Sequence, residues 1–235
     1  MSGTSNHIMT VNNLSIKYTN KRGWSTVFEH IALDDISFHI NQSEVLGVIG
    51  RNGCGKSTLL RVLAGIVPAS TGIVHCNPNI TRSLLTLGLG FRQELSGRDN
   101  ALISSMLQGV NKKVALQKMD EMHEFTELGE FFDQPVRTYS AGMRARLGFA
   151  LAIINSVDVL FIDEVLSVGD AKFRAKAEQV MTNKLNSGQT VVFVSHNIAQ
   201  VNKICDRIIW IRDGKIYRTG APKEVTEEYR EYMAQ

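Results

Sequence analysis

Hydrophobic and polar residues alternate near the start of the chain, whereas the middle of the chain follows a helical period. Alternation at residues 11–16 and 36–40 predicts two half-buried antiparallel strands, and a basic loop is expected between them at 19–30. From about residue 93 to 154 the apolar residues recur at helical intervals. We therefore expect an α/β chain that a helical insertion interrupts.

Short apolar runs bounded by turn residues predict strands that are buried on both faces. Four such runs occur, at residues 45–49, 157–162, 190–194 and 208–211. The Asp-Gly pair at 213–214 tolerates positive φ, so a hairpin turn into residues 216–218 is expected. A charged helix is expected over 222–235, with Val225, Tyr229 and Met233 on one face.

The composition is that of an ordinary soluble globular chain. Of 235 residues, 43% are hydrophobic and 21% are charged, and the net charge of +3 is too small to indicate a nucleic-acid partner. No apolar run reaches the roughly 18 residues that a membrane helix needs. The three cysteines are far apart and form no CxxC pair, which is typical of a reducing compartment. Any link to a membrane is therefore expected to go through a partner.

Residues 50–57 match the pattern G-x-x-x-x-G-K-[ST] and lie between the strand at 45–49 and a helix expected over 57–67. The glycines let backbone N–H groups point at phosphate oxygens, Lys56 supplies a charge, and Ser57 offers a hydroxyl to Mg²⁺. The predicted phosphate-binding set is Gly50, Arg51, Asn52, Gly53, Cys54, Gly55, Lys56, Ser57 and Thr58. Cys54 is either a small filler or a thiol whose pKa is lowered near a helix N-terminus.

Two carboxylates follow the strand at 157–162, where ligands bind in open α/β sheets. Asp163 is predicted to reach Mg²⁺, directly or through water. Glu164 is predicted to orient and deprotonate an attacking water. The pair indicates that ATP is hydrolysed and not only bound.

The segment Tyr139-Ser140-Ala141-Gly142-Met143 resembles the Leu-Ser-Gly-Gly-Gln signature of ATP-binding cassette (ABC) proteins, although only Ser140 and Gly142 match. Asp170 lies where that family has its D-loop, and His196 lies where it has its switch histidine. The resemblance spans residues 9–220. It implies a phosphate-loop NTPase (RecA-like) core with an N-terminal antiparallel β-subdomain and an inserted α-helical signature subdomain.

The resemblance also implies a division of the chain and a mode of assembly. One nucleotide-binding domain would span 1–235, with an α/β core at 1–92 and 155–220, a helical subdomain at 93–154, a helical tail at 221–235 and no C-terminal carbohydrate-binding domain. Two copies would pack head to tail and hold two ATP molecules with Mg²⁺.

Particular residues take their expected roles from the family. Ser140, Gly142 and Asp170 would contact nucleotide across the dimer, and His196 would contact the γ-phosphate. Tyr18 would stack on adenine, with Trp24 and Phe28 as competitors for that role. Either Gln93 or Glu94 would fill the role of the family's Q-loop glutamine.

The strings around residues 87–100, 138–143 and 163–170 resemble one subfamily, the ATPases of polysaccharide exporters. That resemblance implies an integral-membrane permease dimer as partner, export of a lipid-linked polysaccharide of O-antigen type, and a peripheral position on the cytoplasmic face of the inner membrane. The basic segment 21–24 either lies near the permease or lipid headgroups or is a solvated loop. A soluble ABC ATPase of DNA repair or translation and an ABC importer subunit are the alternatives.

Overall fold

The computed structural model of the chain describes residues 6–22, 26–85, 90–155, 157–163 and 170–234, with side chains left undescribed at 20–22, 26–28 and 186. The chain divides into two compact units. One, here called the P-loop unit, comprises residues 1–80 and 188–235, and the other, the signature unit, comprises residues 81–187.

The first sheet of the P-loop unit has three antiparallel strands in the order β2-β1-β4. These strands are β1 (His7–Arg22), β2 (Thr26–Asn41) and β4 (Thr71–Cys76). Strand β1 buries Val11 and Leu14, which are three positions apart, because its register with β2 shifts between them. Asn13 lies at that shift with φ of 49° and donates its amide to Asp35 Oδ1 over 2.8 Å. A bulge thus keeps both apolar residues on the core face.

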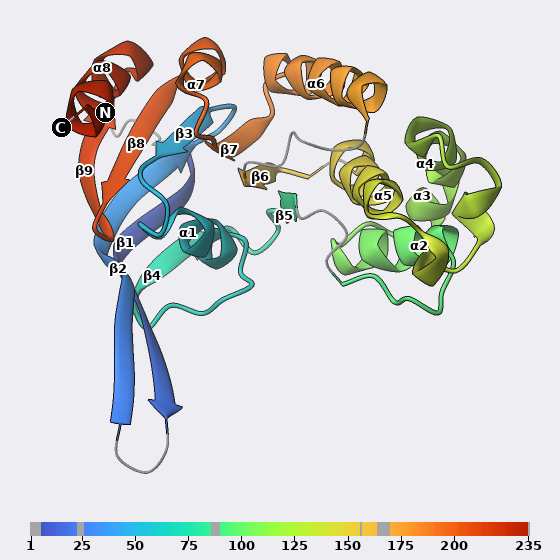
Figure 1. The fold of residues 1–235 in the computed structure, drawn as a ribbon, viewed down its shortest axis with the longest axis horizontal. Helices are drawn as coiled ribbons and strands as arrows, with labels where there is room; N and C mark the ends of the chain where they lie inside the picture. The colour runs from blue at the N-terminus through green and yellow to red at the C-terminus, as the bar shows by residue number, and fades with distance from the viewer. Residues whose placement is uncertain (1–5, 23–25, 86–89, 156, 164–169, 235) are drawn as a thin grey trace. The chain divides into compact units, whose positions relative to one another are not determined.

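The expected loop over residues 19–30 is instead a β-hairpin, which Figure 1 shows extending from the three-stranded sheet. Strands β1 and β2 stay paired from Tyr18↔His30 to Arg22↔Thr26. Backbone hydrogen bonds between two strands need no apolar alternation, and residues 19–30 have none, so the sequence pattern carried no strand signal there. Lys17 and Glu29 add an ion pair of 3.2 Å across the hairpin.

The second sheet of the P-loop unit runs in the order β7-β3-β8-β9. Its strands are β3 (Val45–Ile49), β7 (Thr190–Val194), β8 (Arg207–Arg212) and β9 (Lys215–Gly220). Strand β3 is parallel to β7 and β8, and β9 returns antiparallel to β8 through a turn in which Asp213 and Gly214 have φ of 50° and 77°. The strands and the hairpin turn expected here are confirmed.

The described residues of this unit form the helices α1 (Lys56–Leu63), α7 (Ile198–Ile204) and α8 (Pro222–Met233). The helix expected over 57–67 therefore ends earlier, at Leu63. Helix α8 buries Val225 and Tyr229 against this unit, whereas Met233 is exposed. The ring of Tyr229 lies 5.2 Å from that of Trp210, which is 1% exposed.

The signature unit contains the parallel pair β5 (Arg82–Leu85) and β6 (Val159–Asp163). Its helices are α2 (Gly97–Leu107), α3 (Lys112–Gln117), α4 (Met119–Thr126), α5 (Ala141–Ile154) and α6 (Ala171–Asn186), with short 3₁₀ turns at Gly129–Asp133 and Val136–Thr138. The helical character expected over 93–154 is confirmed. No helix in the described ranges is both long and apolar enough to cross a membrane.

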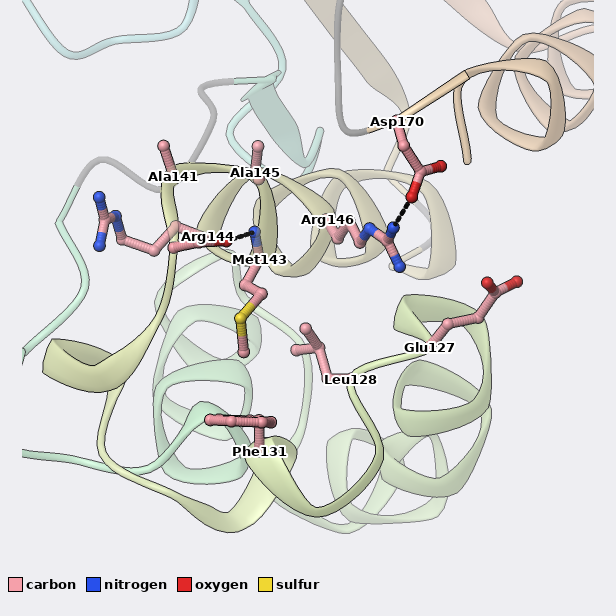
Figure 2. A pocket seen from close by; sticks show the side chains of 11 residues that line it. Glu127, Leu128, Phe131, Ala141, Met143, Arg144, Ala145, Arg146 and Asp170 are labelled. Atoms are coloured by element: carbon pink, nitrogen blue, oxygen red, sulfur yellow. Dashed lines mark hydrogen bonds and ion pairs between the residues drawn. The ribbon is translucent and has the colours of Figure 1, made fainter. Parts of the chain in front are cut away.

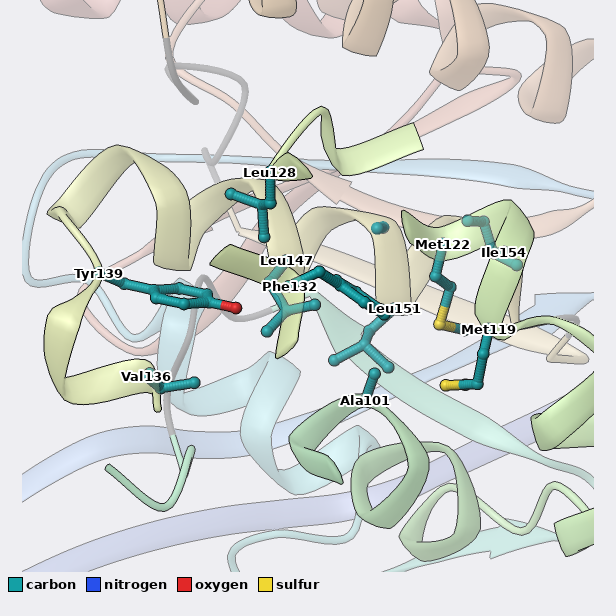
Figure 3. Packing of buried hydrophobic residues seen from close by; sticks show 11 residues of the cluster. Ala101, Met119, Met122, Leu128, Phe132, Val136, Tyr139, Leu147, Leu151 and Ile154 are labelled. Carbon is teal, nitrogen blue, oxygen red and sulfur yellow. The ribbon is translucent and has the colours of Figure 1, made fainter. Parts of the chain in front are cut away.

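The core of the helical part gathers around α5 (Figure 3). Leu147 and Leu151 of α5 pack with Phe132 and Met122 there. Tyr139 is 4% exposed and donates its hydroxyl to the carbonyl oxygen of Phe131 over 2.6 Å. Burial of the phenol raises the pKa of Tyr139 to about 12. The tyrosine that departs from the family's leucine is thus part of a core with a satisfied hydroxyl.

Candidate functional site

The phosphate loop follows β3, whose five residues are all buried, and leads directly into α1. Gly55 is the residue before α1 and has φ of 102°, a conformation that favours glycine. A Cβ at this position would also overlap the backbone carbonyl oxygen of Ala32. Gly55, the N-cap of α1, has no side chain to cap the helix, so the first N–H groups of α1 are available to a ligand.

Lys56 is 7% exposed, and its ammonium group lies inside the loop. Its Nζ donates to the carbonyl oxygens of Gly50 and Arg51 over 2.8 and 2.9 Å. These contacts hold the charge next to the backbone that is expected to surround the phosphates. Ser57 is exposed and Thr58 is partly buried at the start of α1.

Cys54 is buried within the same loop, and burial raises the pKa of its thiol. The nearby charge of Lys56 acts in the opposite direction but has the smaller effect. The interpretation of Cys54 as a thiol with a lowered pKa is therefore contradicted, and the interpretation as a small filler agrees with its burial.

A cavity of about 490 Å³ borders the phosphate loop within the P-loop unit. Its lining comprises His30, Ile31, Ala32, Arg51, Asn52, Gly53, Cys54, Trp210, Ile211, Arg212, Asp213, Gly214 and Tyr232. Tyr18, the residue expected to stack on adenine, is 42% exposed on β1. Trp24 lies outside the described residues, so the choice among the three aromatic residues stays a prediction.

His196 follows β7 at the same sheet edge from which the phosphate loop leaves β3. Val194 pairs with Val48 in the parallel register, so His196 and Gly50 each lie two residues beyond a paired position. The His196 side chain is exposed, and the hydroxyl of neighbouring Ser195 accepts a hydrogen bond from Asn197 N over 3.1 Å. The structure thus brings His196, the predicted switch histidine, and the phosphate loop to one edge, as expected for open α/β sheets.

Asp163 ends β6 in the signature unit, where its side chain is half-buried. Glu164 lies outside the described residues, so its role stays a prediction. The two oxygen donors predicted for Mg²⁺, Ser57 and Asp163, belong to different compact units. A hydroxyl and a carboxylate have the chemistry that Mg²⁺ prefers. Within the described ranges, no cluster of three or more His, Cys, Asp or Glu residues forms a metal site by itself.

Ser140 is the N-cap of α5, and its exposed Oγ accepts a hydrogen bond from Met143 N over 3.2 Å. Because a serine hydroxyl can accept and donate at once, its O–H can still donate to a ligand. Gly142 is in the first turn of α5, and a Cβ there would meet only Ser140 Oγ, at 3.8 Å. Neither its backbone conformation nor crowding by the residues that the structure describes requires glycine at 142. Its bare backbone suits close approach by a bound group.

A cavity of about 790 Å³ lies next to Ser140 (Figure 2). It is lined by Glu127, Leu128, Phe131, Ser140, Ala141, Gly142, Met143, Arg144, Ala145, Arg146 and Asp170. In Figure 2, Leu128, Phe131 and Met143 form an apolar part, and Arg146 meets Asp170 in a charged part. Ser140, Gly142 and Asp170 were expected to contact nucleotide, and the structure places all three at this one cavity.

Asp170 is the N-cap of α6, and its Oδ1 accepts a hydrogen bond from Phe173 N over 2.9 Å. This backbone donor and, to a smaller extent, the charge of Arg146 lower the pKa of Asp170. Arg146 was missed by the sequence analysis. The available signal was its place as the last charged residue before a fully apolar helical run, 147–154.

Gln93 and Glu94 both precede α2 and are exposed. The carbonyl oxygen of Gln93 accepts a hydrogen bond from Arg137 N over 2.9 Å. The choice between these two side chains for the Q-loop role stays a prediction.

Similarity to known proteins agrees with this geometry. Residues 33–167 match the family model described as ABC transporter. The O-antigen export system ATP-binding protein RfbB of Klebsiella pneumoniae is 43% identical over 206 residues, which cover 88% of this chain and 83% of that protein. The teichoic acids export ATP-binding protein TagH of Lactococcus lactis subsp. lactis is 41% identical over 202 residues, or 86% of this chain and 43% of that protein.

The fold also resembles solved structures. A dimeric post-hydrolysis structure of the ATP-binding cassette MJ0796, bound to ADP and Pi, superposes with a TM-score of 0.73 at 20% identity. It covers 91% of this chain and 98% of that one. The expected phosphate-loop NTPase fold is thereby confirmed. With the family match and these relatives together, the chain belongs to the ABC transporter family.

Proposed function

We propose that this chain is the ATP-binding and ATP-hydrolysing subunit of an ABC exporter that moves a lipid-linked polysaccharide across the inner membrane with a separate permease. The observation that carries the proposal is the 43% identity, over 88% of the chain, to a protein named for O-antigen export. The similarity to TagH, which is named for teichoic acids export, supports the same class of function. Neither name favours DNA repair, translation or import.

ATP binding is assigned to the phosphate loop and α1. The uncapped start of α1 and the charge of Lys56 face the same phosphates. Phosphate oxygens would take over the ammonium group from the carbonyl oxygens of Gly50 and Arg51. Ser57 and Asp163 would hold Mg²⁺, which supplies charge neutralisation to the phosphates when it is bound.

Hydrolysis is assigned to two residues beyond strand ends. Glu164 would deprotonate the attacking water, and His196 would contact the γ-phosphate. His196 is supported by its place at the sheet edge next to the phosphate loop. Glu164 is supported by its position directly after the Asp163 carboxylate in the sequence.

A second copy of the chain is the proposed partner at the nucleotide. Ser140 and Gly142 offer a hydroxyl and an open backbone at a helix N-terminus, which suits a phosphate. The chain carries one phosphate loop and one such helix start, so two chains packed head to tail would complete two sites. The dimeric structure of MJ0796 belongs to the same fold.

The permease is proposed to meet the signature unit at α2 and α3. These helices carry exposed apolar side chains at Ile103, Met106, Leu107, Val114 and Leu116. Grouped apolar side chains on a surface indicate an interaction site. The assembly would lie on the cytoplasmic face of the inner membrane, without a nucleic-acid partner.

Loss of the P-loop charge tests the proposal. Lys56→Ala should lower ATP turnover by about a hundredfold or more, because a preorganised phosphate contact is lost. Glu164→Gln should bind ATP and accumulate as a closed dimer on gel filtration. Surface polysaccharide should disappear in cells that carry either variant, while the permease still copurifies with the wild-type chain. Wild-type polysaccharide display with Lys56→Ala would contradict the export function.

A further inference from the structure

Arg146 connects three segments of the signature unit through one side chain. Its Nη2 lies 2.6 Å from Asp170 Oδ2, its Nη1 donates to Thr126 O over 3.5 Å, and its Cζ lies 4.9 Å from the Phe173 ring centroid. Only 17% of the side chain is exposed. The guanidinium group therefore joins the signature helix α5 to the end of α4 and the start of α6.

Asp170 is held from two sides. One carboxylate oxygen caps α6 at Phe173 N, and the other bonds to Arg146. The neighbouring cations Lys176 and Lys172 pair with Glu127 instead, at 2.9 and 3.8 Å. The link between α5 and α6 at this point is thus made by Arg146.

Asp170 follows the proposed base Glu164 by six positions in the sequence. Six residues of backbone span at most about 20 Å, so an anchor at Asp170 restricts where that segment ends. Ser140 is the N-cap of α5, the helix that carries Arg146.

We propose that Arg146 is a positioning residue for ATP hydrolysis, which holds Asp170 relative to the phosphate-facing start of α5 through their ion pair. This inference rests on the proposed ATPase function. It concerns turnover first, because Arg146 acts through Asp170 and the start of α5, whereas the phosphate loop that is proposed to bind ATP within the same chain belongs to the other unit. A loss of the pair should therefore lower kcat and leave KM for ATP nearly unchanged.

The chain offers a matched control in Arg98 and Asp133. Arg98 Nε lies 2.6 Å from Asp133 Oδ1, and Arg98 Cζ lies 5.1 Å from the Phe132 ring centroid. The pair repeats the chemistry of Arg146, Asp170 and Phe173 but joins α2 to the 3₁₀ turn at Gly129–Asp133. A purely structural role would be shared by both pairs.

The test measures phosphate release and thermal unfolding for the purified 235-residue chain and its variants. Asp170→Asn keeps the helix cap, since asparagine is a good N-cap, and removes the charge. Arg146→Gln and Asp170→Asn should each lower kcat about tenfold, as expected for a lost charge-assisted hydrogen bond. The double variant should be no slower than either single variant, and Arg146→Lys should recover part of the rate.

Arg98→Gln should lower the melting temperature as Arg146→Gln does and keep the wild-type kcat. Equal losses of kcat in both arginine variants, or additive losses in the double variant, would overturn the positioning role. A loss with Asp170→Asn but not with Arg146→Gln would also overturn it, because Asp170 would then act directly. Retained turnover in Lys56→Ala would instead count against the proposed ATPase site.

Discussion

The starts of helices α1 and α5 are both expected to meet phosphate, yet they are built in opposite ways. Helix α1 begins after Gly55, whose φ of 102° and missing Cβ are required by the fold, and no side chain caps it. Helix α5 begins with Ser140 as an ordinary N-cap, and the described part of the chain would leave room for a Cβ at Gly142. The P-loop end is thus preorganised by buried backbone, whereas the signature end is an exposed surface that a ligand completes.

The largest effect is expected from Gly55→Ala. The alanine must adopt a left-handed backbone conformation and its Cβ overlaps Ala32 O, so unfolding free energy should fall by about 3 kcal/mol or more. Urea unfolding measures the change. Gly53→Ala is the control: φ is 81° but nothing lies within 4 Å of its Cβ, so it should cost only about 1–2 kcal/mol. Equal losses of unfolding free energy in the two variants would show that crowding against Ala32 O adds nothing to the cost of the left-handed backbone conformation.

Gly142→Ala should separate stability from activity. Replacing a helical glycine with alanine should stabilise the chain by about 0.5–1 kcal/mol, since the Cβ meets only Ser140 Oγ at 3.8 Å. ATP turnover should fall nevertheless, because the methyl group lies where phosphate approaches. Urea unfolding and phosphate release measure the two changes. An alanine variant with full turnover would show that the bare backbone at 142 serves no ligand.

The smallest expected loss of stability is that of Ser140→Ala. Loss of the cap on Met143 N should cost about 1 kcal/mol. The N-cap Asn111 of α3, which accepts from Lys113 N over 2.9 Å, provides a control in Asn111→Ala. Both variants should lose similar stability in thermal unfolding, but only Ser140→Ala should also lose turnover. Similar ATP turnover in both variants would show that Ser140 acts only as a helix cap.

Local sequence patterns were enough to predict most of the sheet at the P-loop. The run 45–49, the phosphate loop after it and the Asp-Gly turn at 213–214 each depend on a few adjacent residues. Strands β4 and β5 gave no comparable signal. Strand β4 is mostly exposed and β5 has four residues, so each is defined by its pairing with β1 or β6 and not by its own apolar pattern.

The candidate site divides in the same way. Lys56, Ser140 and His196 lie in motifs that are contiguous in sequence, and the structure puts them at helix starts or strand ends. Cys54, by contrast, is buried by residues that the fold brings around it. This burial raises the pKa of its thiol, whereas a helix N-terminus alone would lower it. Desolvation is a property of the packed fold, so sequence spacing could not supply it.

By itself the sequence determined the family, the phosphate loop, the signature segment and the alternation of strands and helices, because these depend on residue types at fixed local spacing. Only the tertiary structure decided that residues 18–22 and 26–30 pair as a hairpin, that a Cβ at Gly142 would meet only Ser140 among the described residues, and that Arg146 meets Asp170. None of these features follows from residue types at a fixed local spacing. Backbone pairing, steric space and ion pairing depend on where the folded chain brings the groups together.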